Sequence, residues 1–227
     1  MRSTRIATTV ALALLVAVVP LALPAGAQDT SEQEALDQRV SDFLANTRWG
    51  RGDMNVPEVD GQKLFDLIVE NGYTRAVEVG MSTGRSTIWI AWALSKTGGK
   101  VVTVEIDERR YRQALANFEE AGLSSFIDAR LADAHELVPE LEGPFDFAFI
   151  DADKDWYVQY FHSLLPELEA GGCFTAHNVS ESSGRRGRGR GGTGAFVQEL
   201  LATPGLDTEF FTRGGGLSVS YKRPPGQ

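Results

Sequence analysis

Acidic and amide side chains follow several apolar runs of the sequence, at points where β-strands would end. Glu78 follows the run 73–77 and opens the stretch EVGMSTGRST, residues 78 to 87. Later runs close on Glu105, on Asp133, on Asp151 and on the pair His177-Asn178. In an open sheet of parallel strands, ligands bind beyond the carboxyl ends of the strands. These residues are therefore the candidates for a ligand site.

The turn after Glu78 reads G-M-S-T-G, from Gly80 to Gly84. A dinucleotide site needs G-x-G-x-x-G, whose middle glycine lets the backbone approach a pyrophosphate. That glycine is absent here, and the Glu78 carboxylate would repel a diphosphate but attract a cation. No Gly-Lys-Ser/Thr follows, so a P-loop is excluded too. The pattern indicates a nucleoside-like ligand without phosphates and leaves a nicotinamide oxidoreductase as a distant alternative.

Glu105 lies 25 residues after Gly80, at the end of the next predicted strand. A carboxylate there can accept both hydroxyls of a ribose, although strand-end acids also cap helices. Together with Glu78 and Asp133, it offers acceptors for an ammonium group, a ribose and an adenine amino group. S-adenosylmethionine carries all three, and the sequence predicts it as the ligand.

The elements that must position these residues alternate along the chain. Helices are expected over 29–47 and 57–69, and five strand–helix units follow from residue 74 to residue 202. The strands are continuous apolar runs, which is typical of sheets covered by helices on both faces. Two more strands, 207–212 and 216–222, are separated by a glycine-rich turn. We therefore predict a Rossmann-like α/β fold, with a doubly wound, mainly parallel seven-stranded sheet and a C-terminal antiparallel hairpin.

Four short motifs together resemble those of one enzyme family. They are E-V-G-M-S-T-G-R-S, V-T-V-E-I-D, F-I-D-A-D-K and H-N-V, within a similarity that runs from about Met54 to Lys222. They resemble the class I S-adenosylmethionine-dependent O-methyltransferases of the catechol and caffeoyl-coenzyme A type, which also use a metal. The resemblance implies methylation of a small hydroxylated acceptor.

The resemblance also implies roles for individual residues. Lys154 would be the general base, and Asp151 would act in catalysis, in cofactor binding and as a metal ligand. The cofactor would be held by residues from five segments, namely Val56, Glu78, Gly80, Ser86, Glu105, Ile106, Asp133, Ala134 and Asp151.

The end of the fifth predicted strand departs from the family pattern. The family has Asp-Asn there, and this chain has His177-Asn178. The sequence leaves three interpretations open: Asp151, His177 and Asn178 bind a metal softer than magnesium, the site has lost its metal, or His177 is structural. Thr212 lies where catechol enzymes have a substrate-binding glutamate, so the acceptor is not specified.

The N-terminus has the features of a secretory signal peptide. Arg2 and Arg5 precede the apolar run 6–23, and Ala25-Gly26-Ala27 fits a cleavage site. We expect residues 1–27 to be removed and 28–227 to form a single exported methyltransferase domain. An uncleaved membrane anchor is the alternative. Without the leader the net charge is near −11, which disfavours binding to nucleic acid or to acidic membranes. A homodimer is compatible with the sequence.

The segment 180–194, rich in glycine, serine and arginine, is expected to be a mobile loop. It is either a lid over the site or a solvated insertion. Because an exported protein has no evident cofactor supply, a non-catalytic binding protein on a methyltransferase scaffold is the second functional hypothesis. The joint presence of Glu78, Glu105, Asp133 and Lys154 favours an enzyme.

Overall fold

The computed structural model describes residues 25–50, 52–186, 193–224 and 226. The chain divides into two compact units, Met1–Ala35 and Leu36–Gln227. Helix α1 (Ala25–Asn46) crosses this division, and every other described element belongs to the second unit. Nearly all of the predicted signal peptide lies outside the described residues. Within the described ranges, no helix is long and apolar enough to cross a membrane.

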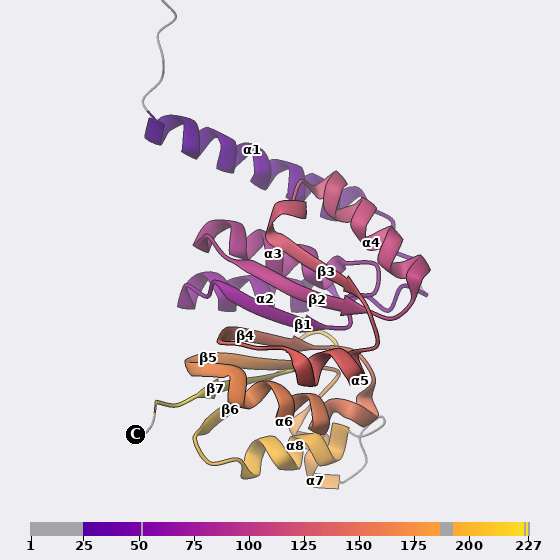
Figure 1. Cartoon of the computed structure of the whole chain (residues 1–227), viewed down its shortest axis with the longest axis vertical. Helices are drawn as coiled ribbons and strands as arrows, with labels where there is room; N and C mark the ends of the chain where they lie inside the picture. The colour runs from indigo at the N-terminus through magenta and orange to yellow at the C-terminus, as the bar shows by residue number, and fades with distance from the viewer. Residues whose placement is uncertain (1–24, 51, 187–192, 225, 227) are drawn as a thin grey trace, which may run out of the picture. The chain divides into compact units, whose positions relative to one another are not determined.

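Seven strands form one sheet in the order β3-β2-β1-β4-β5-β7-β6, as Figure 1 shows. The first five are parallel, and β7 is antiparallel to both β5 and β6. This arrangement confirms the predicted fold, including the C-terminal hairpin. The strands are β1 (Arg75–Val79), β2 (Lys100–Glu105), β3 (Ile127–Leu131), β4 (Phe145–Ile150), β5 (Leu168–His177), β6 (Leu206–Phe211) and β7 (Leu217–Lys222).

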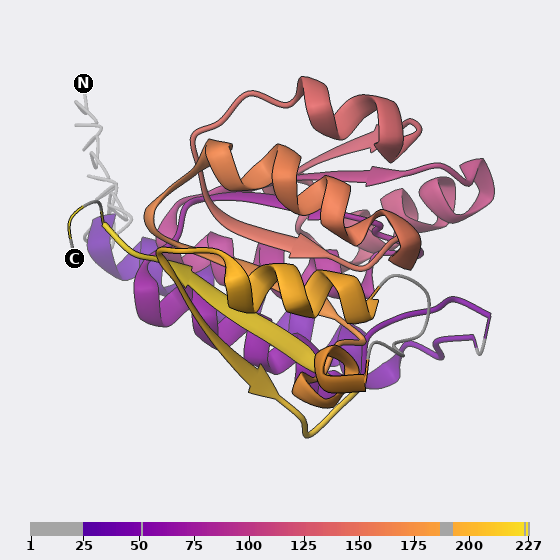
Figure 2. The same ribbon diagram turned by 90° about the horizontal axis from the view of Figure 1, so that it is seen from below.

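Helices cover both faces of the sheet, which lies between them in the view of Figure 2. Helices α2 (Glu58–Asn71), α3 (Arg85–Thr97) and α4 (Glu108–Ala121) pack on one face. The other face carries α6 (Tyr157–Glu167), α8 (Thr193–Ala202) and the turn that includes α5 (Ala134–Leu137) and the 3₁₀ turn η2 (Val138–Glu140). Two further 3₁₀ turns are η1 (Ser124–Phe126) and η3 (Lys154–Trp156).

The central strand β4 shows why the strands read as continuous apolar runs. Phe147 and Phe149 belong to the core under α2 and α3, whereas Ala148 and Ile150 belong to the core under α6 and α8. Side chains alternate between the faces of a strand, and here both faces are buried. Each large apolar side chain buried in this way contributes roughly 1.5–3 kcal/mol.

Two predicted boundaries were wrong. The sequence predicts a helix over 155–168 and a strand over 173–179, but strand β5 begins at Leu168, which pairs with Phe145 before a register shift, so the preceding helix ends at Glu167. Part of the predicted loop 180–194 is helical, since α7 spans Glu181–Arg186 and α8 already begins at Thr193. The rest of that loop, 187–192, lies outside the described residues.

Candidate active site

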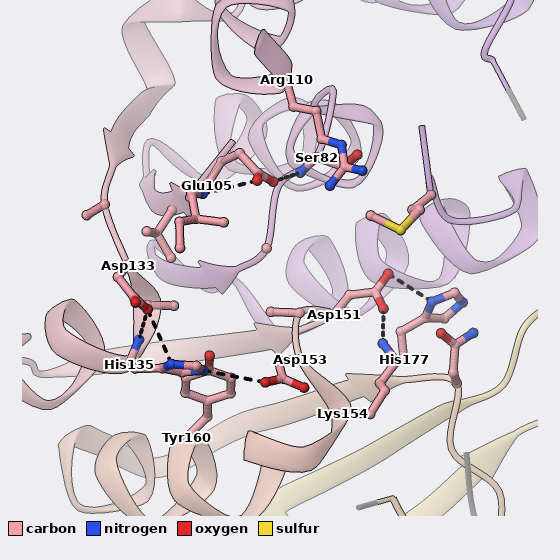
Figure 3. Close-up of a pocket in the computed structure, with 18 of the residues that line it drawn as sticks. Ser82, Glu105, Arg110, Asp133, His135, Asp151, Asp153, Lys154, Tyr160 and His177 are labelled. Carbon is pink, nitrogen blue, oxygen red and sulfur yellow. Dashed lines mark hydrogen bonds and ion pairs between the residues drawn. The ribbon is translucent and has the colours of Figure 1, made fainter. Parts of the chain in front are cut away.

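A cavity of about 810 Å³ opens beyond the carboxyl ends of β1, β2, β4 and β5, where the sequence predicts the ligand. Figure 3 shows three groups of side chains around it: Glu105 with Ser82 and Arg110, Asp133 with His135, and Asp151 with Lys154 and His177. Most of the predicted site residues line this cavity, namely Gly80, Glu105, Ile106, Asp133, Ala134, Asp151, Lys154, His177 and Asn178.

The glycine turn after β1 contributes Gly80 and Ser82 to the lining of the cavity. Gly80 adopts φ +93°, and a Cβ on it would lie 3.0 Å from the backbone of Ala152. Gly84 adopts φ +94°, and a Cβ there would lie 2.4 Å from the Phe118 ring. The two glycines therefore serve a left-handed backbone and close packing, and not an approach to phosphates.

Glu105 anchors this turn to the end of β2. One carboxylate oxygen accepts the backbone N–H of Ser82 at 2.9 Å, and the other accepts those of Ile106 and Asp107 at 3.0 and 2.9 Å. Three of about four acceptor positions of a carboxylate are thus used within the protein. The remaining position is available to a hydroxyl of a ligand. Glu105 both holds the turn in place and faces the cavity.

Three predicted cofactor residues, Val56, Glu78 and Ser86, are buried and do not line the cavity. Glu78 is fully buried, and one of its oxygens accepts hydrogen bonds from the hydroxyls of Thr87 and of Thr103, the latter at 2.6 Å. Within the described part of the chain, its other oxygen has no partner. A contact between these three residues and a cofactor stays a prediction.

Burial raises the pKa of Glu78 to about 7 from its ordinary value of 4.5. The hydroxyls of Ser86, Thr103 and Thr87 oppose this shift, and the negative charge of Asp151 adds to it. Glu78 is therefore a buried acid with an unpartnered oxygen, which a cationic group of a ligand could satisfy.

His135 lies in the cavity wall between two acids, Asp133 and Asp153. Its backbone N–H donates a hydrogen bond to Asp133 Oδ1 at 2.9 Å. Its ring nitrogens lie 3.4 Å from Asp133 Oδ1 and 3.5 Å from Asp153 Oδ2. The ring stacks on Trp156, with 3.9 Å between the ring centroids. Together with Tyr160, this group forms an aromatic wall suited to a planar heterocycle.

Lys154 is held at the cavity wall by two partners. Its Nζ lies 2.5 Å from Asp151 Oδ1 and 2.6 Å from the hydroxyl oxygen of Tyr157. The Tyr157 hydroxyl donates to the carbonyl of His177 at 3.0 Å, so it accepts from Lys154. Burial raises the pKa of Tyr157 well above 10, which keeps the phenol neutral. Lys154 Nζ is therefore held in a fixed position beside a carboxylate, from which it could act as a general base once its ammonium form has released a proton.

His177 lies between two carboxylates. Its Nδ1 is 3.0 Å from Asp151 Oδ2, and its Nε2 is 3.0 Å from Asp60 Oδ2. An ionised carboxylate can only accept, so the ring must donate from both nitrogens and carry a positive charge. Burial alone would lower the pKa of His177, but the hydrogen bonds and charges of Asp151 and Asp60 outweigh it and raise the pKa to about 9.

The predicted metal ligands do not fit a divalent cation in this arrangement. A metal needs a ring nitrogen of His177 without a proton, and both nitrogens face carboxylates. Both oxygens of Asp151 are already engaged, one by Lys154 and one by His177. Across the described ranges of the chain, no group of three or more His, Cys, Asp or Glu side chains could hold a metal ion. The geometry does not support a metal on Asp151, His177 and Asn178.

Several residues of the site were not predicted from the sequence. The most important, Asp60, is fully buried, does not line the cavity and lies 117 residues from its partner His177. In the sequence it is an acid in the first turn of a helix, where acids commonly complement the helix dipole. The others are Ser82, Arg110, Asp153 and Tyr160, of which Arg110 lies in the DERR segment directly after Glu105. Ser82 and Asp153 lie within the motifs G-M-S-T-G and F-I-D-A-D-K, but the sequence assigned no role to any of these four residues.

The sequence matches the model of a family described as O-methyltransferase over residues 27–182. This match covers more than half of the chain, which therefore belongs to the O-methyltransferase family, in agreement with the fold and with the resemblance of its motifs.

Among curated relatives, the catechol O-methyltransferase of Niastella koreensis is 40% identical over 107 residues, covering 45% of this chain and 48% of the relative. The caffeoyl-CoA O-methyltransferase of Stellaria longipes is 33% identical over 132 residues, covering 56% and 54%. The matches thus span about half the length of these curated relatives.

Among solved structures, an O-methyltransferase of Bacillus cereus in complex with SAH has a TM-score of 0.68 and 28% identity, covering 85% of this chain and 91% of that one. The O-methyltransferase TomG of Streptomyces achromogenes, solved with SAM, has a TM-score of 0.69 and 22% identity, covering 84% and 90%. The second likeness bears on the fold alone.

Proposed function

We propose that this protein transfers a methyl group from S-adenosylmethionine to an oxygen of a small hydroxylated acceptor, of the phenol or catechol class. One observation carries the proposal: a single cavity joins the acceptors Glu105 and Asp133 at one end to the Lys154–Asp151 pair at the other. The first pair suits a nucleoside, and the second suits the removal of a proton from a hydroxyl. The named relatives act on catechol-type and caffeoyl-CoA acceptors, which supports this class.

The cavity fits the cofactor in size and in chemistry. Its volume of about 810 Å³ lies within the usual range of small-molecule sites, roughly 300–1,000 Å³. Glu105 retains a position for a ribose hydroxyl. Glu78 does not line the cavity, so a hydrogen bond from the ammonium group to its unpartnered oxygen stays a prediction. Ile106, whose side chain is 66% exposed, offers apolar surface to an adenine ring.

When bound, the cofactor supplies a methyl group on a positively charged sulfur. The protein's part is to orient the acceptor and to take its proton, because an oxygen attacks best when it is deprotonated. Lys154 must first release its own proton to solvent; the neutral amine would then receive the proton of the acceptor, and the carboxylate of Asp151 at 2.5 Å would stabilise the ammonium group that forms again. Tyr157 keeps Nζ in position by accepting its hydrogen bond. No step is assigned to a metal, since the donor set does not fit one.

Calorimetric titration with S-adenosylmethionine, followed by transfer assays on phenols and catechols, tests the proposal. Lys154→Met is expected to lose transfer while cofactor affinity stays within about twofold, because a general base contributes roughly 10²–10⁴ in rate. Lys100→Met, at an exposed lysine at the start of β2, is the matched control. Unchanged transfer by Lys154→Met would refute the base assignment. Cofactor binding without transfer to any acceptor would favour the binding-protein hypothesis.

We also propose that the chain is exported and cleaved after Ala27. The support is the charged start, the apolar run 6–23 and the A-x-A site, of which only the last lies within the described residues. N-terminal sequencing of the protein from separated cell fractions is expected to begin at Gln28, outside the cytoplasm. Full-length protein in the cytoplasmic fraction would contradict export.

A further inference from the structure

The Asp60–His177–Asp151 cluster is built into the fold by close packing. Asp60 Oδ2 accepts hydrogen bonds from Nε2 of His177 and from the backbone N–H of Gly215, the latter at 2.6 Å. A Cβ on Gly214 would lie 2.1 Å from Asp60 Oδ1, and one on Gly215 would lie 2.4 Å from His177 Nε2. The turn between β6 and β7 thus closes over the cluster at two glycines. A carboxylate from α2, a ring from β5 and the hairpin meet at the end of the cavity that holds Lys154, where the methyl acceptor would bind. We call this end the acceptor end.

The charges at this end cancel without any added ion. In the resting site, before Lys154 releases its proton, Asp60 and Asp151 are negative, and His177, donating from both ring nitrogens, and Lys154 are positive. The four side chains are 0%, 10%, 5% and 22% exposed, in that order. A divalent cation placed among them would leave two uncompensated positive charges out of water, which is strongly unfavourable. The imidazolium already provides a cation beside Asp151.

The following inference rests on the proposed methyl transfer. We propose that the Asp60–His177–Asp151 cluster takes the place of a divalent metal, so that this chain transfers methyl groups without one. The imidazolium donates a hydrogen bond from Nδ1 to Asp151 Oδ2, which orients the other oxygen, Oδ1, toward Lys154. Asp60 accepts the hydrogen bond of the other ring nitrogen, Nε2. His177 and Asp60 are therefore positioning residues for Lys154, and the acceptor needs only one hydroxyl, because no chelation by two is required.

Metal binding is the first test, because it does not depend on activity. Chelator-treated mature protein, with the product SAH present, is titrated with Mn²⁺ and followed by electron paramagnetic resonance. Wild type is expected to bind no stoichiometric Mn²⁺. His177→Asp removes the imidazolium and adds a third carboxylate, and it is expected to bind one equivalent, since hard cations prefer oxygen ligands. His162→Asp, at an exposed histidine paired with Glu199, is the matched control and should bind none.

Two further measurements hold even if His177→Asp does not fold. The chain has three histidines, so ¹⁵N spectra of the ring nitrogens can be assigned by single substitutions. His177 should show a doubly protonated ring at neutral pH that Mg²⁺ does not alter. Transfer by wild type should be equal, within about twofold, in chelator and in Mg²⁺ or Mn²⁺. Asp60→Asn should lower kcat at least about tenfold with unchanged cofactor affinity, as expected for a group that positions a general base.

The outcomes separate this inference from the proposed function. One equivalent of Mn²⁺ on wild type, a neutral His177 ring, or transfer that appears only with metal would overturn the inference and leave methyl transfer intact. An unchanged kcat in Asp60→Asn would also overturn it. Absence of transfer under every condition, with no metal bound and a charged ring, would refute the proposed function while the exclusion of metal from this site would stand.

Discussion

Replacement of Glu78 by glutamine should stabilise the protein in a way that depends on pH. The pKa of Glu78 is raised to about 7 in the folded protein, from 4.5 when exposed to water. The folded form therefore holds the proton more tightly than the unfolded chain, and stability falls as pH rises from about 4.5 to about 7. The shift of about 2.5 pKa units corresponds to a cost of about 3 kcal/mol above pH 7. Glutamine is neutral throughout and does not carry this cost.

Urea unfolding of wild type and Glu78→Gln at pH 4 and pH 8 measures the effect. The difference in unfolding free energy between the two should shift by about 3 kcal/mol in favour of the variant at the higher pH. If Glu78 binds the ammonium group as predicted, the same variant should bind S-adenosylmethionine about 10- to 100-fold more weakly, because that partner loses its charge. The matched control is Glu169→Gln, at an exposed glutamate paired with Arg75, where the difference should change by less than about 1 kcal/mol. A difference for Glu78→Gln that stays flat with pH would refute the reasoning.

Three further predictions follow from the same geometry. Glu105→Ala should weaken cofactor binding by about 1.5–3 kcal/mol in calorimetry, and Glu108→Ala, at an exposed glutamate paired with Arg112, should not. Gly84→Ala should cost about 2–4 kcal/mol in urea unfolding, because its Cβ meets Phe118 at φ +94°, whereas Gly72→Ala, with φ +69° and open space, should cost about 1–2 kcal/mol. Tyr157→Phe should lower kcat about tenfold through loss of the hydrogen bond to Lys154, with cofactor affinity unchanged; an unaltered kcat would show that Asp151 alone positions the amine.

The predictions that succeeded from sequence rest on local chemistry. Strand β4 is a run of apolar residues because both of its faces are covered, and the acids that follow such runs lie at one edge because parallel strands end there. Glu105, Asp133, Asp151 and Lys154 therefore line one cavity, as predicted. The G-M-S-T-G turn lacks the glycine that lets a backbone approach a pyrophosphate, and the exclusion of a dinucleotide on that ground stays a prediction.

By itself, then, the sequence determined the fold, the edge of the sheet that holds the site and the residue types found there. Only the tertiary structure decided the state of the acceptor end. The partner of His177 is Asp60, from a helix 117 residues away, and Gly214 and Gly215 close over both. No local pattern encodes such a contact, because it depends on how α2 and the terminal hairpin pack against β5. The protonation of His177 follows from that packing, since two carboxylates, and not the ring's own chemistry, determine that both nitrogens keep their protons.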